Sequence, residues 1–133
     1  MRKRLPIISM LLLLTAATPA ARAQQPPPPA PEPVFDPYHA EKSIEIGHHY
    51  MKKGNYDAAI ERFEDAARYK PNFAKPYLLL GEAYEKKGDK AEAVKAYRRY
   101  LEILPSAPDA GKVRNRIAKL SRELDRAARR RSR

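Results

Sequence analysis

Histidine and cysteine, the side chains that most often bind metals or act as nucleophiles, are scarce in this sequence, which has three histidines and no cysteine. His48 and His49 are adjacent, and adjacent side chains on a helix point about 100° apart, so they cannot share a metal ion as a pair four residues apart would. The spacing from His39 to His48 is not a metal-binding pattern either. The sequence therefore predicts no metal site and no cofactor.

Serine, glycine and carboxylate positions give no catalytic pattern. None of the serines lies in the strained, glycine-flanked turn that exposes a nucleophilic hydroxyl. The five glycines fit helix ends and helix packing, so no glycine-rich loop remains for a phosphate. Acidic residues are numerous but are spread along helix faces. We therefore predict that the protein is not an enzyme and has no small-molecule substrate.

The first 23 residues have the order of a secretory signal peptide. Residues 2–4 are basic, residues 7–17 are an apolar stretch, and residues 21–23 are an Ala-Arg-Ala cleavage pattern. The apolar stretch has 11 residues, whereas a membrane span needs about 20. We expect cleavage after Ala23 and a periplasmic or secreted protein without a lipid-anchor cysteine. An uncleaved membrane anchor is the alternative.

Residues 24–37 form a predicted linker in which seven of 14 positions are proline. Proline lacks a backbone donor and restricts φ, so such a segment favours an extended polyproline II conformation. We expect it to space the following domain from the N-terminal segment.

The charge of the chain is concentrated at its two ends. The whole sequence has a net charge of +11, with 27 basic and 16 acidic residues. Residues 1–23 contain four basic residues, and residues 112–133 contain ten basic and two acidic residues. Residues 24–111 contain 13 basic and 14 acidic residues, a net charge of −1. A nucleic-acid partner for the central domain is therefore not indicated.

A period of 34 residues runs through the centre of the chain. The first series is Tyr50, Gly54, Ala59, Phe63 and Pro71. The second series is Tyr84, Gly88, Ala93, Tyr97 and Pro105. Gly47 and Gly81 are related by the same step. A strict period of this length signals stacked helical units.

Capping residues and prolines predict where the helices begin and end. The predicted helices run from Pro37, capped by Asp36, to about Lys53; from Asn55 to about Tyr69; from Asn72 to Gly88; and from Asp89 to just before Pro105. No segment alternates apolar and polar residues with period two, so we predict an all-α fold without strands.

The repeated residues closely resemble the tetratricopeptide repeat family over residues 38–105. The resemblance implies a short right-handed α-solenoid of two helical hairpins, at about 40–73 and 74–107. In that family small residues let the two helices of a hairpin approach, large residues fill the space between them, and a proline closes the unit. The matching residues are Gly47, Tyr50, Ala59, Phe63 and Pro71 in the first repeat and Tyr77, Gly81, Tyr84, Ala93, Tyr97 and Pro105 in the second.

A fifth helix is predicted over residues 106–128, followed by a basic tail at 129–133. Ser106 and Asp109 have the spacing of a capping box. An apolar stripe follows on an otherwise charged helix, formed by Val113, Ile117, Leu120 and Leu124. Tyr100 stands where the family usually has a small residue, so we expect it to pack under this capping helix, which shields the last hairpin from water.

The resemblance implies that the first helix of each hairpin lines a concave groove that holds an extended peptide or a partner helix. The corresponding positions are Glu41, Ile44, His48, Met51, Lys52, Lys75, Leu78, Glu82, Glu85 and Lys86, with Arg116 and Lys119 on the fifth helix. Ile44 and His48 occupy the places of the basic and asparagine clamp that some members use for a C-terminal carboxylate. A receptor for chaperone tails is therefore disfavoured.

The predicted function is a non-catalytic protein–protein interaction scaffold in the bacterial cell envelope, as part of an envelope assembly complex. The alternative is a polyanion or membrane-surface binder that acts through an arginine-rich C-terminal tail. That tail comprises Arg126, Arg129, Arg130, Arg131 and Arg133. Two repeats bury little core, so the fifth helix or a second copy of the chain must supply the missing interface.

Overall fold

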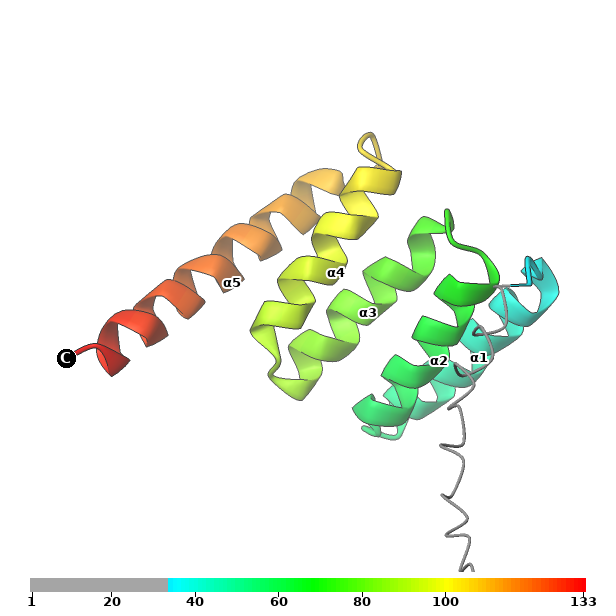
Figure 1. Cartoon of the computed structure of the whole chain (residues 1–133), viewed down its shortest axis with the longest axis horizontal. Coiled ribbons are helices and arrows are strands. Elements are labelled where there is room, and N and C mark those ends of the chain that lie inside the picture. Colours follow the sequence, from blue (N-terminus) through cyan, green and yellow to red (C-terminus); the bar gives the residue numbers. More distant parts are fainter. Residues whose placement is uncertain (1–33) are drawn as a thin grey trace, which may run out of the picture. The chain divides into compact units, whose positions relative to one another are not determined.

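The computed structural model describes residues 34–133. The predicted signal peptide and residues 24–33 of the predicted linker lie outside these residues. Five helices follow one another: α1 (Pro37–Lys52), α2 (Tyr56–Tyr69), α3 (Ala74–Lys87), α4 (Lys90–Ile103) and α5 (Ala110–Arg131). The part of the chain from residue 34 onward contains no strand, and the predicted all-α fold is confirmed. Each helix packs against the next one in the chain, as Figure 1 shows.

The ends of α1, α2 and α4 follow from local side-chain chemistry. Asp36 accepts a hydrogen bond from the His39 backbone amide at 3.0 Å, and this amide contact is the largest cause of the lowered pKa of the Asp36 carboxyl. Asn55 and Asp89 cap α2 and α4 in the same way, through the amides of residues 58 and 92. Gly54 follows α1 and Gly88 follows α3, with φ of 73° and 93°. Glycine adopts this left-handed conformation without strain.

Two predicted caps are wrong. Asn72 does not cap α3, because Phe73 is the capping residue and packs against the core while its amide donates to the Lys70 carbonyl. The predicted capping box of Ser106 and Asp109 is also wrong, because Asp109 itself is the residue before α5 and makes no side-chain cap. Its carboxylate accepts a hydrogen bond from the Tyr100 hydroxyl at 2.6 Å instead. In both places packing between helices takes precedence over the local capping preference.

Pro37 is the first residue of α1, as predicted from the Asp36 cap, although the range predicted as a linker also included it. One helix boundary differs from the prediction. The fifth helix begins at Ala110, not at Ser106, and it continues to Arg131. Most of the segment predicted as a basic tail is therefore helical, and its arginines have the spacing that a helix imposes.

The two helices of each hairpin approach closely at a glycine. A Cβ atom on Gly47 would lie 2.4 Å from the Phe63 ring, and one on Gly81 would lie 2.3 Å from the Tyr97 ring. Ala59 and Ala93 are fully buried in the facing helices. The 34-residue period thus repeats one contact, a ring of the second helix lying on a glycine of the first.

The buried side chains form two clusters. One joins the first hairpin to α3 and includes Ile44, Phe63 and Leu80. The other joins α4 to α5 and includes Tyr97, Tyr100, Val113 and Leu120. Tyr100 is 5% exposed and lies under α5, with Ile117 and Leu124 packed at the edge of the cluster. The fifth helix therefore covers the apolar face of α4 that would otherwise be in contact with water.

Candidate functional site

Three hollows lie along the surface formed by α1, α3 and α5, which we call the groove face. The first has a volume of about 440 Å³ and lies between α1 and the start of α3. Its lining residues are Tyr38, Glu41, Lys42, Ile44, Glu45, His48 and Lys75. A weak ion pair of 3.8 Å joins Lys75 to Glu41 across the two helices.

The second hollow, of about 450 Å³, continues along the same helices toward their C-terminal ends. It is lined by Met51, Glu82, Glu85, Lys86 and Arg116. Met51 is half-buried against the first core cluster. An apolar contact surface and charges of both signs therefore meet in one depression.

The third hollow, of about 240 Å³, lies between α3 and α5. It shares Glu82 and Arg116 with the second hollow and adds Leu78, Asp109, Lys112 and Val113. The second and third hollows therefore adjoin each other, and α5 borders both of them through Arg116.

Arg116 connects three helices at the centre of the groove face. Its guanidinium donates to the Tyr97 hydroxyl at 2.9 Å and to Glu82 at 3.3 Å. The Tyr97 hydroxyl donates in turn to Glu85 at 2.8 Å. These bonds hold α5 against α3 and α4 and set the spacing of the two carboxylates that face the second hollow.

Tyr97 acts in this network as a neutral hydrogen-bond donor to Glu85. Burial raises the pKa of the Tyr97 hydroxyl far above its ordinary value, and the hydrogen bond to Glu85 raises it further. The folded protein therefore holds the proton of this bond more tightly than the unfolded chain does. The arrangement offers donors, acceptors and apolar contacts, which is suited to holding another molecule.

Most of the predicted groove residues line the hollows, and two do not. The ten that line them are Glu41, Ile44, His48, Met51, Lys75, Leu78, Glu82, Glu85, Lys86 and Arg116. Lys52 and Lys119 are exposed but line none of these three hollows. Ile44 is only 3% exposed, so the prediction that it forms part of an accessible apolar strip is wrong. Its side chain is part of the core between α1 and α2.

Sequence reasoning missed several lining residues. Tyr38, Lys42 and Glu45 border the first hollow, and their spacing from Glu41 places them on or beside the same helix face. This periodicity could have identified them. Asp109 and Lys112 border the third hollow, and only the position of α5 against α3 brings them there.

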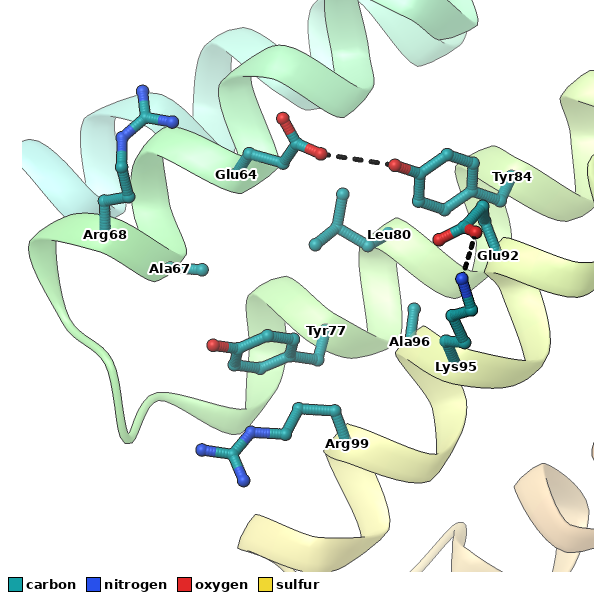
Figure 2. A pocket seen from close by; sticks show the side chains of 10 residues that line it. All are labelled: Glu64, Ala67, Arg68, Tyr77, Leu80, Tyr84, Glu92, Lys95, Ala96 and Arg99. Carbon is teal, nitrogen blue, oxygen red and sulfur yellow. Dashed lines mark hydrogen bonds and ion pairs between the residues drawn. The ribbon is translucent and has the colours of Figure 1, made fainter.

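A further hollow, not predicted from the sequence, lies on the opposite side of α3, between α2 and α4. It has a volume of about 450 Å³, and Figure 2 shows Tyr77, Leu80 and Tyr84 at its centre. The Tyr84 hydroxyl donates to Glu64 at 3.2 Å, and the Arg99 guanidinium lies 5.7 Å from the Tyr77 ring. Burial, followed by Glu64, raises the pKa of Tyr84 to about 12. This fourth hollow therefore has an apolar floor and a charged rim.

Neither a metal cluster nor a membrane-spanning helix is found within residues 34–133. No three histidine or acidic side chains there lie close enough together to hold a metal ion. None of the helices α1–α5 combines the length and the apolar character that crossing a bilayer requires.

Comparison with known proteins supports the repeat assignment. Residues 44–108 match the model of the tetratricopeptide repeat family. Over 93 residues, which are 70% of this chain and 17% of the relative, the chain is 28% identical to Hsp70-Hsp90 organizing protein 3 of Arabidopsis thaliana. It is 37% identical over 57 residues, which are 43% of this chain and 16% of the relative, to small glutamine-rich tetratricopeptide repeat-containing protein 2 of Mycosarcoma maydis.

A third relative has an enzyme's name. Over 62 residues, 47% of this chain and 6% of the relative, the chain is 34% identical to a probable UDP-N-acetylglucosamine–peptide N-acetylglucosaminyltransferase of Arabidopsis thaliana. The chain thus spans less than a fifth of the length of each of these three relatives. The family match, the 34-residue period and the two glycine-to-ring contacts agree, and residues 44–108 have the sequence and the helix packing of tetratricopeptide repeats.

Proposed function

We propose that this protein is a non-catalytic scaffold that holds a peptide segment or a helix of another protein on its groove face. Tetratricopeptide repeats generally mediate protein–protein interaction. The observation that carries the proposal is the set of three hollows along α1, α3 and α5, two of which adjoin through Glu82 and Arg116. A row of depressions suits the successive side chains of one bound segment.

The lining of the hollows defines the chemistry of the segment that would fit. Half-buried Met51 and Leu78 offer apolar contacts in the second and third hollows. Exposed charges of both signs are offered by Glu41 and Lys75 in the first hollow and by Lys86 in the second. A segment with apolar side chains flanked by both acidic and basic groups would satisfy this surface, whereas bulk charge attraction would contribute little.

We also propose that the scaffold acts in the bacterial cell envelope. The support is the basic, apolar and small-x-small order of residues 2–23, which is the order of an export signal. Sequencing the N-terminus of protein recovered from the periplasm tests this, with Gln24 as the expected first residue. Recovery of the chain from the membrane with Met1 intact would contradict cleavage.

The groove proposal is tested with peptides selected from a display library against the full chain. In one variant Lys75→Glu and Lys86→Glu reverse two exposed charges that line the first and second hollows. In the matched control Lys53→Glu and Arg98→Glu make the same charge change at exposed positions that line none of the four hollows.

We expect the groove variant to weaken peptide binding by about tenfold or more, since each desolvated charge contact contributes on the order of 1 kcal/mol. The control should bind with nearly unchanged affinity, and both should remain helical by circular dichroism. Equal loss of binding in the two variants, or none in either, would place the peptide elsewhere.

A further inference from the structure

Helix α5 and the two residues after it carry a concentrated positive charge that the rest of the fold does not neutralise. Residues 112–133 contain ten basic and two acidic residues. Of the two acidic side chains, Glu123 is bound to Lys90 at 2.8 Å, and Asp125 is exposed. Within residues 34–133 no ion pair joins Arg122, Arg126 or Arg129 to a carboxylate.

The helix places these three arginines in one row. At about 100° per residue, Arg126 and Arg129 lie within about 40° of the direction in which Arg122 points. Leu120, which is 3% exposed and faces α4, lies about 200° away on the opposite side. The row therefore points away from the core, and its length along the axis is about 10 Å at 1.5 Å per residue.

This part of α5 is also free of overhanging structure. Every residue from 125 to 133 is exposed, and Figure 1 shows the end of α5 extending past the helices on which it packs. A straight, exposed row of charges fits a flat surface, because all its members can contact a plane at once.

We propose that the row formed by Arg122, Arg126 and Arg129 binds the surface of an anionic lipid bilayer, with α5 lying parallel to the membrane. The charge of the row is complementary to lipid phosphates, and the planar guanidinium of arginine binds phosphate oxygens through two hydrogen bonds at once. Residues 118–133 contain no aromatic, asparagine or glutamine side chain that could stack on or read nucleic-acid bases.

The binding is electrostatic rather than insertive. The side of α5 beyond Leu124 carries Ala127 and Ala128, which are too small to anchor a helix in acyl chains. Raising the salt concentration from about 0.1 M to about 1 M shortens the Debye length from about 10 Å to about 3 Å. We therefore expect high salt to release the protein from the vesicles.

The experiment measures co-sedimentation of the full chain with vesicles of phosphatidylcholine alone and of equal parts phosphatidylcholine and phosphatidylglycerol. The row variant carries Arg122→Gln, Arg126→Gln and Arg129→Gln. The matched control loses the same charge through Lys52→Gln, Lys53→Gln and Arg98→Gln, at exposed positions at the end of α1 and on α4. The uncharged phosphatidylcholine vesicles report binding by other parts of the chain, including the apolar residues 7–17. The parent protein, the row variant and the control variant should therefore bind these vesicles equally.

We expect the row variant to lose about 100-fold in partitioning to the anionic vesicles, since each surface arginine contributes roughly fivefold. The control variant should lose severalfold at most. Equal partitioning of the two variants would overturn the proposal, as would salt-resistant binding. Tighter arginine-dependent binding to duplex DNA than to the anionic vesicles would also overturn it. Because the row does not line the groove face, peptide binding by the row variant should be unchanged.

Discussion

Replacing Gly81 with alanine tests the central packing claim, that the second helix of a hairpin rests on a glycine of the first. The added Cβ would lie 2.3 Å and 2.4 Å from two atoms of the Tyr97 ring, more than 1 Å inside ordinary carbon–carbon contact at about 3.5–4.0 Å. The ring is fully buried. Its hydroxyl is bonded to Glu85 and Arg116 at 2.8 Å and 2.9 Å. The ring cannot move aside without breaking those bonds.

The magnitude follows from two opposing effects. Overpacking of a filled core costs about 1–3 kcal/mol, and the overlap here places Gly81→Ala near the upper value. Against this cost, alanine in a helix interior is about 1 kcal/mol more favourable than glycine for helix stability. The net expectation is a loss of about 2 kcal/mol in the free energy of unfolding. For a domain of about 100 residues this lowers the melting temperature by roughly 8–16 °C.

The assay is thermal and urea unfolding followed by circular dichroism. Gly111→Ala is the matched control, because Gly111 is also helical but a Cβ there would meet nothing within 4 Å. We expect that control to be stabilised by about 0.4–1 kcal/mol. In a Tyr97→Leu background the cost of Gly81→Ala should shrink, since the ring that it meets is absent.

The opposite pattern would refute the reasoning. If Gly81→Ala is as stable as the parent protein, or if its cost is the same with and without the Tyr97 ring, the glycine is not required for the approach of α4 to α3.

Two further predictions concern α5. Truncation after Pro105 should make the remaining domain much less stable in a urea titration, because Val113 and Leu120 are each buried and contribute about 1.5–3 kcal/mol; an unchanged unfolding midpoint would contradict the capping role. Burial, and then Asp109, raises the pKa of Tyr100 from 10.0 to about 12, so the folded state holds this proton more tightly than the unfolded state. The stability due to Tyr100 is complete below pH 10 and is lost as the pH rises toward about 12. Tyr100→Phe should therefore show a smaller loss of unfolding free energy than the parent protein over that interval; parallel curves would contradict the shift.

Helix starts could be predicted from the sequence where the cap is a local interaction. Asp36 and Asn55 bind an amide three residues ahead, and such a bond depends only on neighbouring residues. Asn72 and Asp109 show the limit of this reasoning. Next to Asn72, Phe73 packs against the core and becomes the residue that precedes α3. The carboxylate of Asp109 accepts a hydrogen bond from the Tyr100 hydroxyl of α4 and is not available as a cap.

The residues of the groove face show what helical periodicity can and cannot predict. Periodicity places Glu41, Ile44 and His48 near one face of α1. It does not predict how deeply each side chain is buried, and Ile44 is a core residue that is 3% exposed. The hydrogen-bond partners of Arg116 belong to α3 and α4. The sequence contains no pattern that predicts these contacts.

The sequence by itself determined the repeat, because a 34-residue period of glycines, aromatics and prolines admits one kind of hairpin, built by interactions between near neighbours. It also determined that Val113 and Leu120 share a stripe that needs a partner. Only the tertiary structure decided how the hairpins and α5 meet. That arrangement joins Arg116 to Glu82 and leaves the row of Arg122, Arg126 and Arg129 facing outward. These features depend on distances between residues far apart in the chain, which side-chain packing sets and local sequence preference does not.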